Sequence, residues 1–257
     1  MGELNNKEIE VAEQTEFWVR VGGGLEQSST GERYGPADLE SPPRGGPWRP
    51  LFVEERLVGW MSATSELDFS DQLRQEGERR LRERQAKLLG RLGHKLRSSV
   101  LALQECARQA AFGRPDQLEP IYDQAQEVGR RAAALEVVTL RPPDSPRAVV
   151  LGAVLNLAAP QATRELPGDA LVQGSEPALI EALSRAYEWM GGAGCRIRGE
   201  RRAGWWRLEL NAAAEREPLA LPELGKPLVG YLIEAHLDGW LKRGDEMGAI
   251  IYLPSAD

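Results

Sequence analysis

One proline-free stretch decides the fold: residues 65–113 read SELDFSDQLRQEGERRLRERQAKLLGRLGHKLRSSVLALQECARQAAFG. A run of this length without proline, with apolar residues at helical spacing, predicts a long helix. In its second half, apolar or small side chains recur at alternating intervals of three and four residues. This spacing is typical of helices that pack nearly parallel in a bundle or coiled coil. The seam consists of Leu89, Leu92, Leu96, Ser99, Leu103, Cys106 and Ala110.

A second helix, 116–138, is predicted after a break that reads FGRP at residues 112–115. Asp116 is a candidate N-cap, and Pro120 falls in the first turn, where proline is tolerated. Two seamed helices joined by a tight turn form an antiparallel hairpin. One hairpin cannot cover its own apolar stripe, so we expect a homodimer in which two hairpins form a four-helix bundle. The second seam has the same spacing: Leu118, Ile121, Ala125, Val128, Ala132 and Leu135.

The region before the hairpin, residues 1–64, has the alternation of strands at 16–22 and 50–61. The Gly-, Pro- and Ser-rich stretch 22–47 between them reads as a loop. We expect a small β-containing input region here. A partly ordered arm is the alternative.

The region after the hairpin, 141–257, opens with the helix-breaking run RPPDSP and then alternates in type. Helical patterns and strand patterns follow one another, which predicts an α+β sandwich with helices over one face of a mixed sheet. The helical patterns are 148–162, 176–190 and 227–236, and the strand patterns are 169–174, 194–200, 205–211, 239–243 and 249–254.

Composition excludes several classes of function. The formal net charge is −7, which gives no general attraction to nucleic acid or anionic membrane. The two cysteines, Cys106 and Cys195, form no disulfide framework, and no Cys/His spacing predicts a metal site. No stretch reaches the roughly 18 apolar residues of a membrane span, and the acidic, polar N-terminus is not a secretory signal. We therefore expect a cytoplasmic protein.

One of the two histidines lies in the seamed helix, where the run HKLRSSV begins at His94. With Leu89 and Leu96 as heptad a positions, His94 is an f position and faces solvent. The run resembles the phosphoacceptor box of sensor histidine kinases, His-Glu-Leu-Arg-Thr-Pro-Leu. His94, Leu96 and Arg97 match, and Ser98 is a conservative substitute. The alternative reading is an ordinary surface histidine on a charged helix.

The C-terminal half supplies a second match, because residues 225–239 read GKPLVGYLIEAHLDG and residues 248–254 read GAIIYLP. These resemble the last motifs of the histidine kinase ATP-binding domain: a glycine-rich box, a helix ending in His-Gly-Gly, and a strand ending in Leu-Pro. His236 then belongs to the fold and is structural. The resemblance covers 65–257 and implies a phosphoacceptor hairpin, residues 65–140, followed by an ATPase-like domain.

The ATP site that this resemblance implies is altered at its metal-binding helix. Relatives hold Mg²⁺ through asparagines, and Glu181 and Arg185 occupy those two positions here. An arginine cannot ligate a cation. Residues 211–216, NAAAER, also lack the aspartate and the glycines that contact adenine in the family.

The phosphate loop and the catalytic neighbour are altered as well. The loop survives only as Gly225 and Lys226, and Pro227 removes an amide donor. Lys95 replaces the acidic residue that usually follows the phosphoacceptor histidine, so it supplies no base. We expect that ATP-driven autophosphorylation is lost and that the protein needs no cofactor. ATP with Mg²⁺ would bind only if the altered site still functions.

Three hypotheses for function follow from this resemblance. The first is a dimeric histidine phosphotransferase, in which Lys95 and Arg97 attract the acidic pocket of a response regulator's receiver domain to His94. The second is a non-catalytic scaffold that binds a receiver domain or a partner histidine kinase. The third is a divergent but active ATP-dependent kinase.

Overall fold

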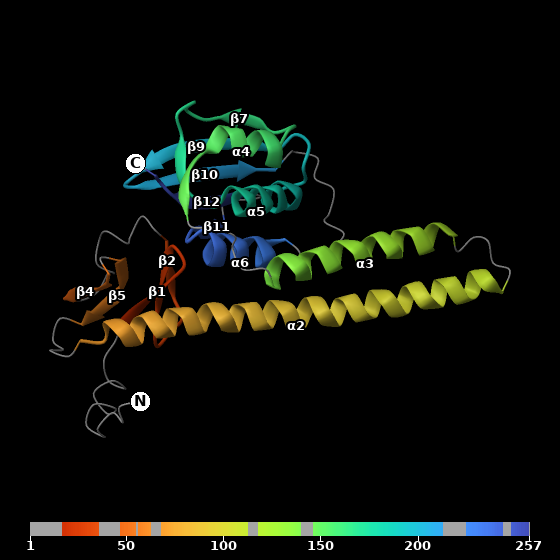
Figure 1. The fold of residues 1–257 in the computed structure, drawn as a ribbon, viewed down its shortest axis with the longest axis horizontal. Helices are drawn as coiled ribbons and strands as arrows, with labels where there is room; N and C mark the ends of the chain where they lie inside the picture. The colour runs from red at the N-terminus through yellow and green to blue at the C-terminus, as the bar shows by residue number, and fades with distance from the viewer. Residues whose placement is uncertain are drawn as a thin grey trace, which may run out of the picture.

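The computed structural model describes residues 17–35, 47–54, 56–62, 68–112, 118–139, 146–212, 225–243 and 248–256. It consists of an N-terminal sheet, a long helical hairpin and a C-terminal α+β domain (Figure 1). The N-terminal sheet is antiparallel, with strand order β3-β2-β1-β5-β4. Its strands are β1 (Phe17–Val21), β2 (Gly24–Gln27), β3 (Arg33–Tyr34), β4 (Trp48–Val53) and β5 (Arg56–Ser62).

Strands β1, β4 and β5 lie where alternation predicts them, because successive side chains point to opposite faces. Val19 packs with apolar residues on the face that meets the hairpin, while Trp18 packs with Leu25 and Trp60 on the other. The prediction of a loop over 22–47 is wrong where β2 and β3 form. Composition misled it, because Gly24 is a strand residue that leaves room for Trp240: a Cβ there would lie 2.0 Å from the indole ring.

The hairpin consists of α2 (Ser70–Ala111) and α3 (Leu118–Thr139). The helix break is confirmed, since α2 ends immediately before Phe112, whereas the proposed N-cap Asp116 lies outside the described residues. The seam of α2 faces inward, with Leu92 and Ser99 buried. No described helix is long and apolar enough to cross a membrane.

Two residues of the predicted seam of α3, Ala125 and Ala132, are exposed within the single chain. The face turned to α2 contains Arg131 instead, which is 6% exposed. Its guanidinium donates to the Ser99 hydroxyl and, at 3.2 Å, to the Lys95 carbonyl oxygen. A charged side chain satisfied in this way can occupy a buried seam, and apolar spacing does not reveal it.

The C-terminal domain has a five-stranded mixed sheet in the order β11-β12-β10-β9-β7, in which only the β7–β9 pair is parallel. Helices α4, α5 and α6 pack on one face of this sheet, as predicted (Figure 1). The strands are β7 (Thr163–Glu165), β9 (Arg196–Arg202), β10 (Trp205–Asn211), β11 (Trp240–Arg243) and β12 (Gly248–Pro254), and the helices are α4 (Leu151–Ala158), α5 (Glu176–Trp189) and α6 (Lys226–His236).

Two features of this domain differ from the sequence prediction. Residues 148–150, predicted as helix, belong to strand β6 (Arg147–Val150), which pairs with β8 (Leu171–Gly174) in a separate two-stranded sheet. The β-branched Val149 and Val150 favour the strand, and the helical pattern begins only after them. The short strand β7 was not predicted. Of the predicted linker, the helix-breaking run at 141–146, residues 141–145 lie outside the described residues.

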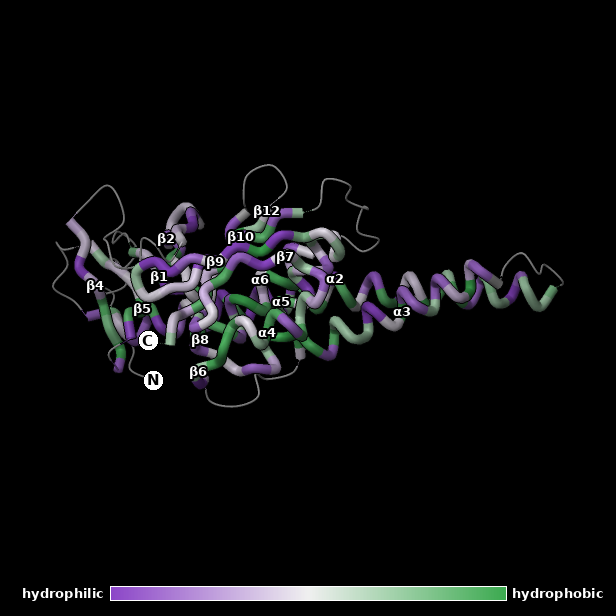
Figure 2. The backbone as a smooth tube through the Cα atoms, turned by 90° about the horizontal axis from the view of Figure 1, so that it is seen from above, coloured by the Kyte–Doolittle hydropathy of each residue, from purple (hydrophilic) through white to green (hydrophobic). Residues whose placement is uncertain are grey.

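The base of the hairpin shares one apolar core with the C-terminal domain. Leu88 and Leu92 of α2 and Val138 of α3 are buried in the same cluster as Leu155 and Ile251 of that domain. The far halves of α2 and α3 project alone from the rest of the chain (Figures 1 and 2). The phosphoacceptor candidate therefore lies on a helix whose base is fixed against the domain.

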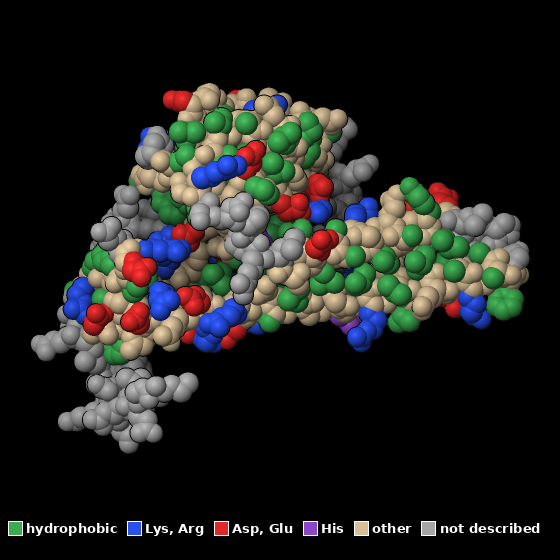
Figure 3. Space-filling view, viewed as in Figure 1, with side chains coloured by type: hydrophobic (Ala, Val, Ile, Leu, Met, Phe, Trp, Pro, Cys, Tyr) green, Lys and Arg blue, Asp and Glu red, His purple; other side chains and the backbone are tan. Residues whose placement is uncertain are grey.

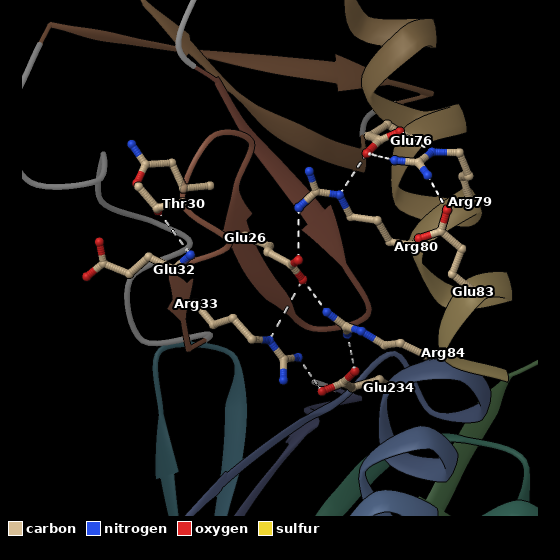
Figure 4. Close-up of polar contacts among 11 residues, drawn as sticks. Glu26, Thr30, Glu32, Arg33, Glu76, Arg79, Arg80, Glu83, Arg84 and Glu234 are labelled. Atoms are coloured by element: carbon tan, nitrogen blue, oxygen red, sulfur yellow. Dashed lines mark hydrogen bonds and ion pairs between the residues drawn. The ribbon is translucent and has the colours of Figure 1, made fainter. Parts of the chain in front are cut away.

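The N-terminal sheet is tied to both other parts by a network of ion pairs (Figure 4). Glu234 of α6 is 5% exposed and pairs with Arg33 of β3 and Arg84 of α2, both at 2.5 Å. Glu26 of β2 pairs with Arg84 and, at 2.9 Å, with Arg80 of α2. Two carboxylates thus bridge the sheet, the long helix and the C-terminal domain.

A second contact fixes the sheet against the end of α6. Asp238 pairs with Arg20 of β1 and Arg56 of β5, at 2.6 Å each. The Gly23 amide donates to the Gly239 carbonyl oxygen at 2.8 Å. Together with the network around Glu234, these contacts join the N-terminal sheet to the C-terminal domain and to α2.

Candidate functional site

His94 lies about halfway along α2, and its side chain is exposed. The buried Leu92 and Ser99 occupy the opposite side of the helix, as the heptad argument predicts. The Ser98 hydroxyl donates to the His94 carbonyl oxygen at 3.1 Å. Ser98 is therefore engaged with the helix backbone.

The surroundings of His94 on α2 are basic. The predicted Lys95 and Arg97 are both exposed. Sequence reasoning overlooked Lys87 and Arg91, although their spacing of four and then three residues to His94 places all three side chains on one face of the helix. The positions one turn from His94 are Gly90, Arg91, Arg97 and Ser98, so α2 presents no carboxylate that could act as a general base there.

The two positions that the resemblance assigns to Mg²⁺ binding, Glu181 and Arg185, are paired with each other. The Arg185 Nε atom lies 2.8 Å from Oε1 of Glu181, one turn earlier on α5. The same guanidinium also reaches Glu188 at 3.2 Å. The one carboxylate that could have served a cation is thus neutralised by an arginine. Among the described residues, no group of three or more His, Cys, Asp or Glu side chains could hold a metal ion.

This pairing predicts that Mg²⁺ gives no gain in affinity for ATP. A cation brought to Glu181 would have to displace a bound guanidinium, and Arg185 would then repel it. Calorimetric titration with ATP, in the presence of Mg²⁺ and then of a chelator, is expected to give affinities that agree within about threefold. A gain of about tenfold or more with Mg²⁺ would overturn this interpretation of α5.

The remaining nucleotide-site positions lie on neighbouring elements. Asn211 is the exposed last residue of β10, and residues 213–216 lie outside the described chain. Gly225 is the buried N-cap of α6, and Lys226 and Pro227 are the exposed first residues of that helix. Helices α5 and α6, which carry Glu181, Arg185 and Lys226, pack side by side.

His236 lies at the end of α6 and does not belong to the surface that carries His94. Its ring stands edge-on to Tyr231, with centroids 5.6 Å apart. It lines a cavity of about 660 Å³ between the N-terminal sheet, the start of α2 and the C-terminal domain. Burial lowers the pKa of His236 below the ordinary value of 6.5.

This lowered pKa predicts a pH dependence of stability. The unfolded chain binds a proton at His236 more readily than the folded one. The folded protein is therefore expected to lose stability as the pH falls below about 6.5 towards the folded pKa. In His236→Gln, the free energy of unfolding should depend less steeply on pH in this window. Urea unfolding at a series of pH values measures the slope, and an unchanged slope in the variant would contradict the prediction.

The structure is similar to solved histidine kinases. The histidine kinase ThkA, in complex with the response regulator protein TrrA, aligns with 97% of this chain and 81% of its own, at 14% identity and a TM-score of 0.54. The histidine kinase AdeS of Acinetobacter baumannii aligns with 64% of this chain and 98% of its own, at 16% identity and a TM-score of 0.48. A bacterial phosphotransferase aligns with 65% of this chain and 94% of its own, at 14% identity and a TM-score of 0.37.

No protein-family model matches the sequence, and no curated protein sequence does so. The likeness to ThkA is therefore one of structure, and it extends over nearly the whole chain. The chain has a sensor-histidine-kinase-like fold, and the predicted order of helical hairpin and α+β domain is confirmed.

Proposed function

We propose that this protein acts in two-component signalling as a dimeric histidine phosphotransferase. In this account His94 accepts a phosphoryl group from the aspartate of a response regulator's receiver domain. The ATPase-like domain keeps its place in the fold but no longer supplies the phosphoryl group. The observation that carries this proposal is the exposed His94 on a basic face of α2, combined with the Glu181–Arg185 ion pair in the position of the metal site.

The transfer needs only groups that the two proteins provide. A ring nitrogen of neutral His94 attacks phosphorus, the bond between phosphorus and the aspartyl oxygen breaks, and the aspartate leaves as a carboxylate. The remaining ring proton passes to solvent. Lys95 and Arg97 lie beside the attacking ring and would attract the acidic pocket of the receiver domain. ThkA was solved with a response regulator bound, which supports a receiver domain as the partner here.

A homodimer is supported by the uncovered face of the projecting hairpin. Tyr122, Ala125 and Ala132 lie along one face of α3 and are exposed in the single chain, as is Leu101 of α2. Figure 3 shows hydrophobic side chains gathered along this part of the hairpin. Tyr122 is 64% exposed and Leu101 is 59% exposed in the single chain. A contiguous exposed apolar face of this kind is typical of a surface that binds another protein, and a second helix pair would cover it.

Ala132→Glu is expected to weaken or split the dimer. The substitution brings two carboxylates into an apolar contact between copies, where each would be desolvated. Light scattering after size exclusion should then give the mass of a single chain. Arg130→Glu, on a solvent-facing side of the same helix, serves as the control and should stay dimeric. A wild-type protein with the mass of one chain at micromolar concentration would contradict the dimer.

A non-catalytic scaffold is the second candidate function. It is favoured by the absence of any carboxylate one turn from His94 and by Lys95 in place of the usual acid. In this case the hairpin surface would bind a receiver domain or a kinase, and His94 would be dispensable.

Incubation with a receiver domain carrying a radiolabelled aspartyl phosphate separates the two candidates. The phosphotransferase should acquire an acid-labile, alkali-stable label and should release inorganic phosphate only slowly. A scaffold should bind the receiver domain but acquire no label.

A further inference from the structure

A second cleft, of about 290 Å³, lies between α2 and α6, and of the altered nucleotide-site positions only Lys226 and Pro227 line it. Helix α2 contributes Lys87 and Arg91 to one wall, and α6 contributes Lys226 to the other. Arg33 and Arg84 lie at the end that meets the Glu234 network. Neither Glu181 nor Arg185 lines this cleft, so it is separate from the position of the family's metal site.

The charges around the cleft do not balance. Arg33 and Arg84 are neutralised by Glu26 and Glu234. The other three cations, Lys87, Arg91 and Lys226, have no carboxylate partner within the described ranges. Three uncompensated cations converge on one small cleft of a chain whose formal net charge is −7.

The chemistry of the walls indicates the class of ligand. Lysine and arginine side chains bind phosphate groups through charge-assisted hydrogen bonds, and the first turn of α6 adds the positive end of a helix dipole. The base of the cleft is apolar, formed by Leu88, Tyr231 and Leu241, each less than 10% exposed. A cationic rim over an apolar base fits a small molecule with a phosphate group and a flat or apolar part.

We infer that the cleft between α2 and α6 binds a phosphate-bearing small molecule, held by Lys87, Arg91 and Lys226 without Mg²⁺. The cleft also borders the phosphoacceptor candidate. At 1.5 Å of helix rise per residue, His94 lies about 4.5 Å along the axis beyond Arg91 and about 10 Å beyond Lys87. A ligand there would neutralise part of the basic face around His94. The inference concerns binding alone, so it does not depend on phosphotransfer by His94.

Separate calorimetric titrations with ADP, pyrophosphate and adenosine test this inference. They are done at low ionic strength, with a chelator present to remove Mg²⁺. ADP is expected to bind more tightly than adenosine, and added salt should weaken its binding, because the cations are exposed. Lys87→Ala with Arg91→Ala should weaken ADP binding by about tenfold or more. Lys226→Ala, at an exposed position on the opposite wall, should also weaken ADP binding. Because Lys226 lies on α6, this loss cannot result from a change in the fold of α2.

Two controls fix the location of the ligand. Arg82→Ala with Arg130→Ala removes the same charge from other faces of the hairpin and should change the affinity by less than about twofold. His94→Ala should also leave ADP binding intact, because His94 does not line the cleft. Absence of ADP and pyrophosphate binding at about 1 mM would overturn the inference. It would equally be overturned if Glu181→Gln with Arg185→Gln abolished binding while the Lys87 and Arg91 substitutions did not.

Discussion

His94→Gln is expected to abolish labelling by a phosphorylated receiver domain while the fold stays intact. The glutamine amide nitrogen is not a nucleophile, so the covalent step has no acceptor, and the rate should fall by about a thousandfold or more. The side chain is exposed on α2 and covers no core residue, so the free energy of unfolding should change by less than about 0.5 kcal/mol. Rapid mixing with labelled receiver domain, followed by gel separation, measures the rate.

The neighbours of His94 provide graded controls for this result. Ser98→Ala should transfer within about twofold of the wild-type rate, because its hydroxyl bonds the backbone carbonyl. Lys95→Ala with Arg97→Ala should slow transfer, and added salt should slow the wild type in the same way, since both act on encounter. Equal labelling of His94→Gln and wild type would refute His94 as the acceptor.

Glu234→Gln is expected to destabilise the protein by about 2 to 3 kcal/mol. The substitution leaves Arg33 and Arg84 facing a neutral amide at the junction of three parts of the chain. This expected loss of stability is smaller than for a fully buried charge pair, because the side chains of Arg33 and Arg84 are 36% and 27% exposed, respectively. Urea unfolding followed by tryptophan fluorescence measures it, since Trp240 contacts the Arg33 guanidinium at 4.3 Å.

A matched control for Glu234 lies on the same chain. Glu105 pairs with Arg108 on the exposed part of α2, at 2.8 Å. Glu105→Gln should leave the midpoint of urea unfolding almost unchanged, because exposed ion pairs within a helix contribute little to stability. A loss at Glu234 no larger than that at Glu105 would mean that the network does not hold the domain in place.

The hairpin could be predicted from the sequence because its signal is local. The three-and-four spacing of Leu89, Leu92 and Leu96 fixes both the helix and the side on which His94 stands. The apolar pattern did not reveal one buried polar residue: Arg131 of α3 is buried against α2 through its contacts with Ser99 and Lys95. Strand β2 was missed for a similar reason, because a contact between distant residues determines it. Trp240 packs against Gly24, so only a glycine fits at this position of the strand.

The junction could not have been predicted from local patterns. Glu234 is separated by 150 residues from Arg84 and by 201 from Arg33, and no periodicity connects them. The positions that the resemblance assigns to a metal are intermediate between these two cases. The residues Glu181 and Arg185 were identified as substitutions, and their spacing of four residues allows an ion pair on one helix face. Their mutual pairing, which turns two substitutions into one neutral unit, is seen only in the structure.

The central claim is that a phosphoryl group reaches His94 from another protein rather than from ATP. Parallel incubations of the wild type test it most directly, one with γ-labelled ATP and Mg²⁺ and one with a labelled receiver domain, each repeated with His94→Gln. We predict an acid-labile label that requires His94 and appears only with the receiver domain. A label from ATP that appears at a comparable rate and is lost in His94→Gln would contradict the account.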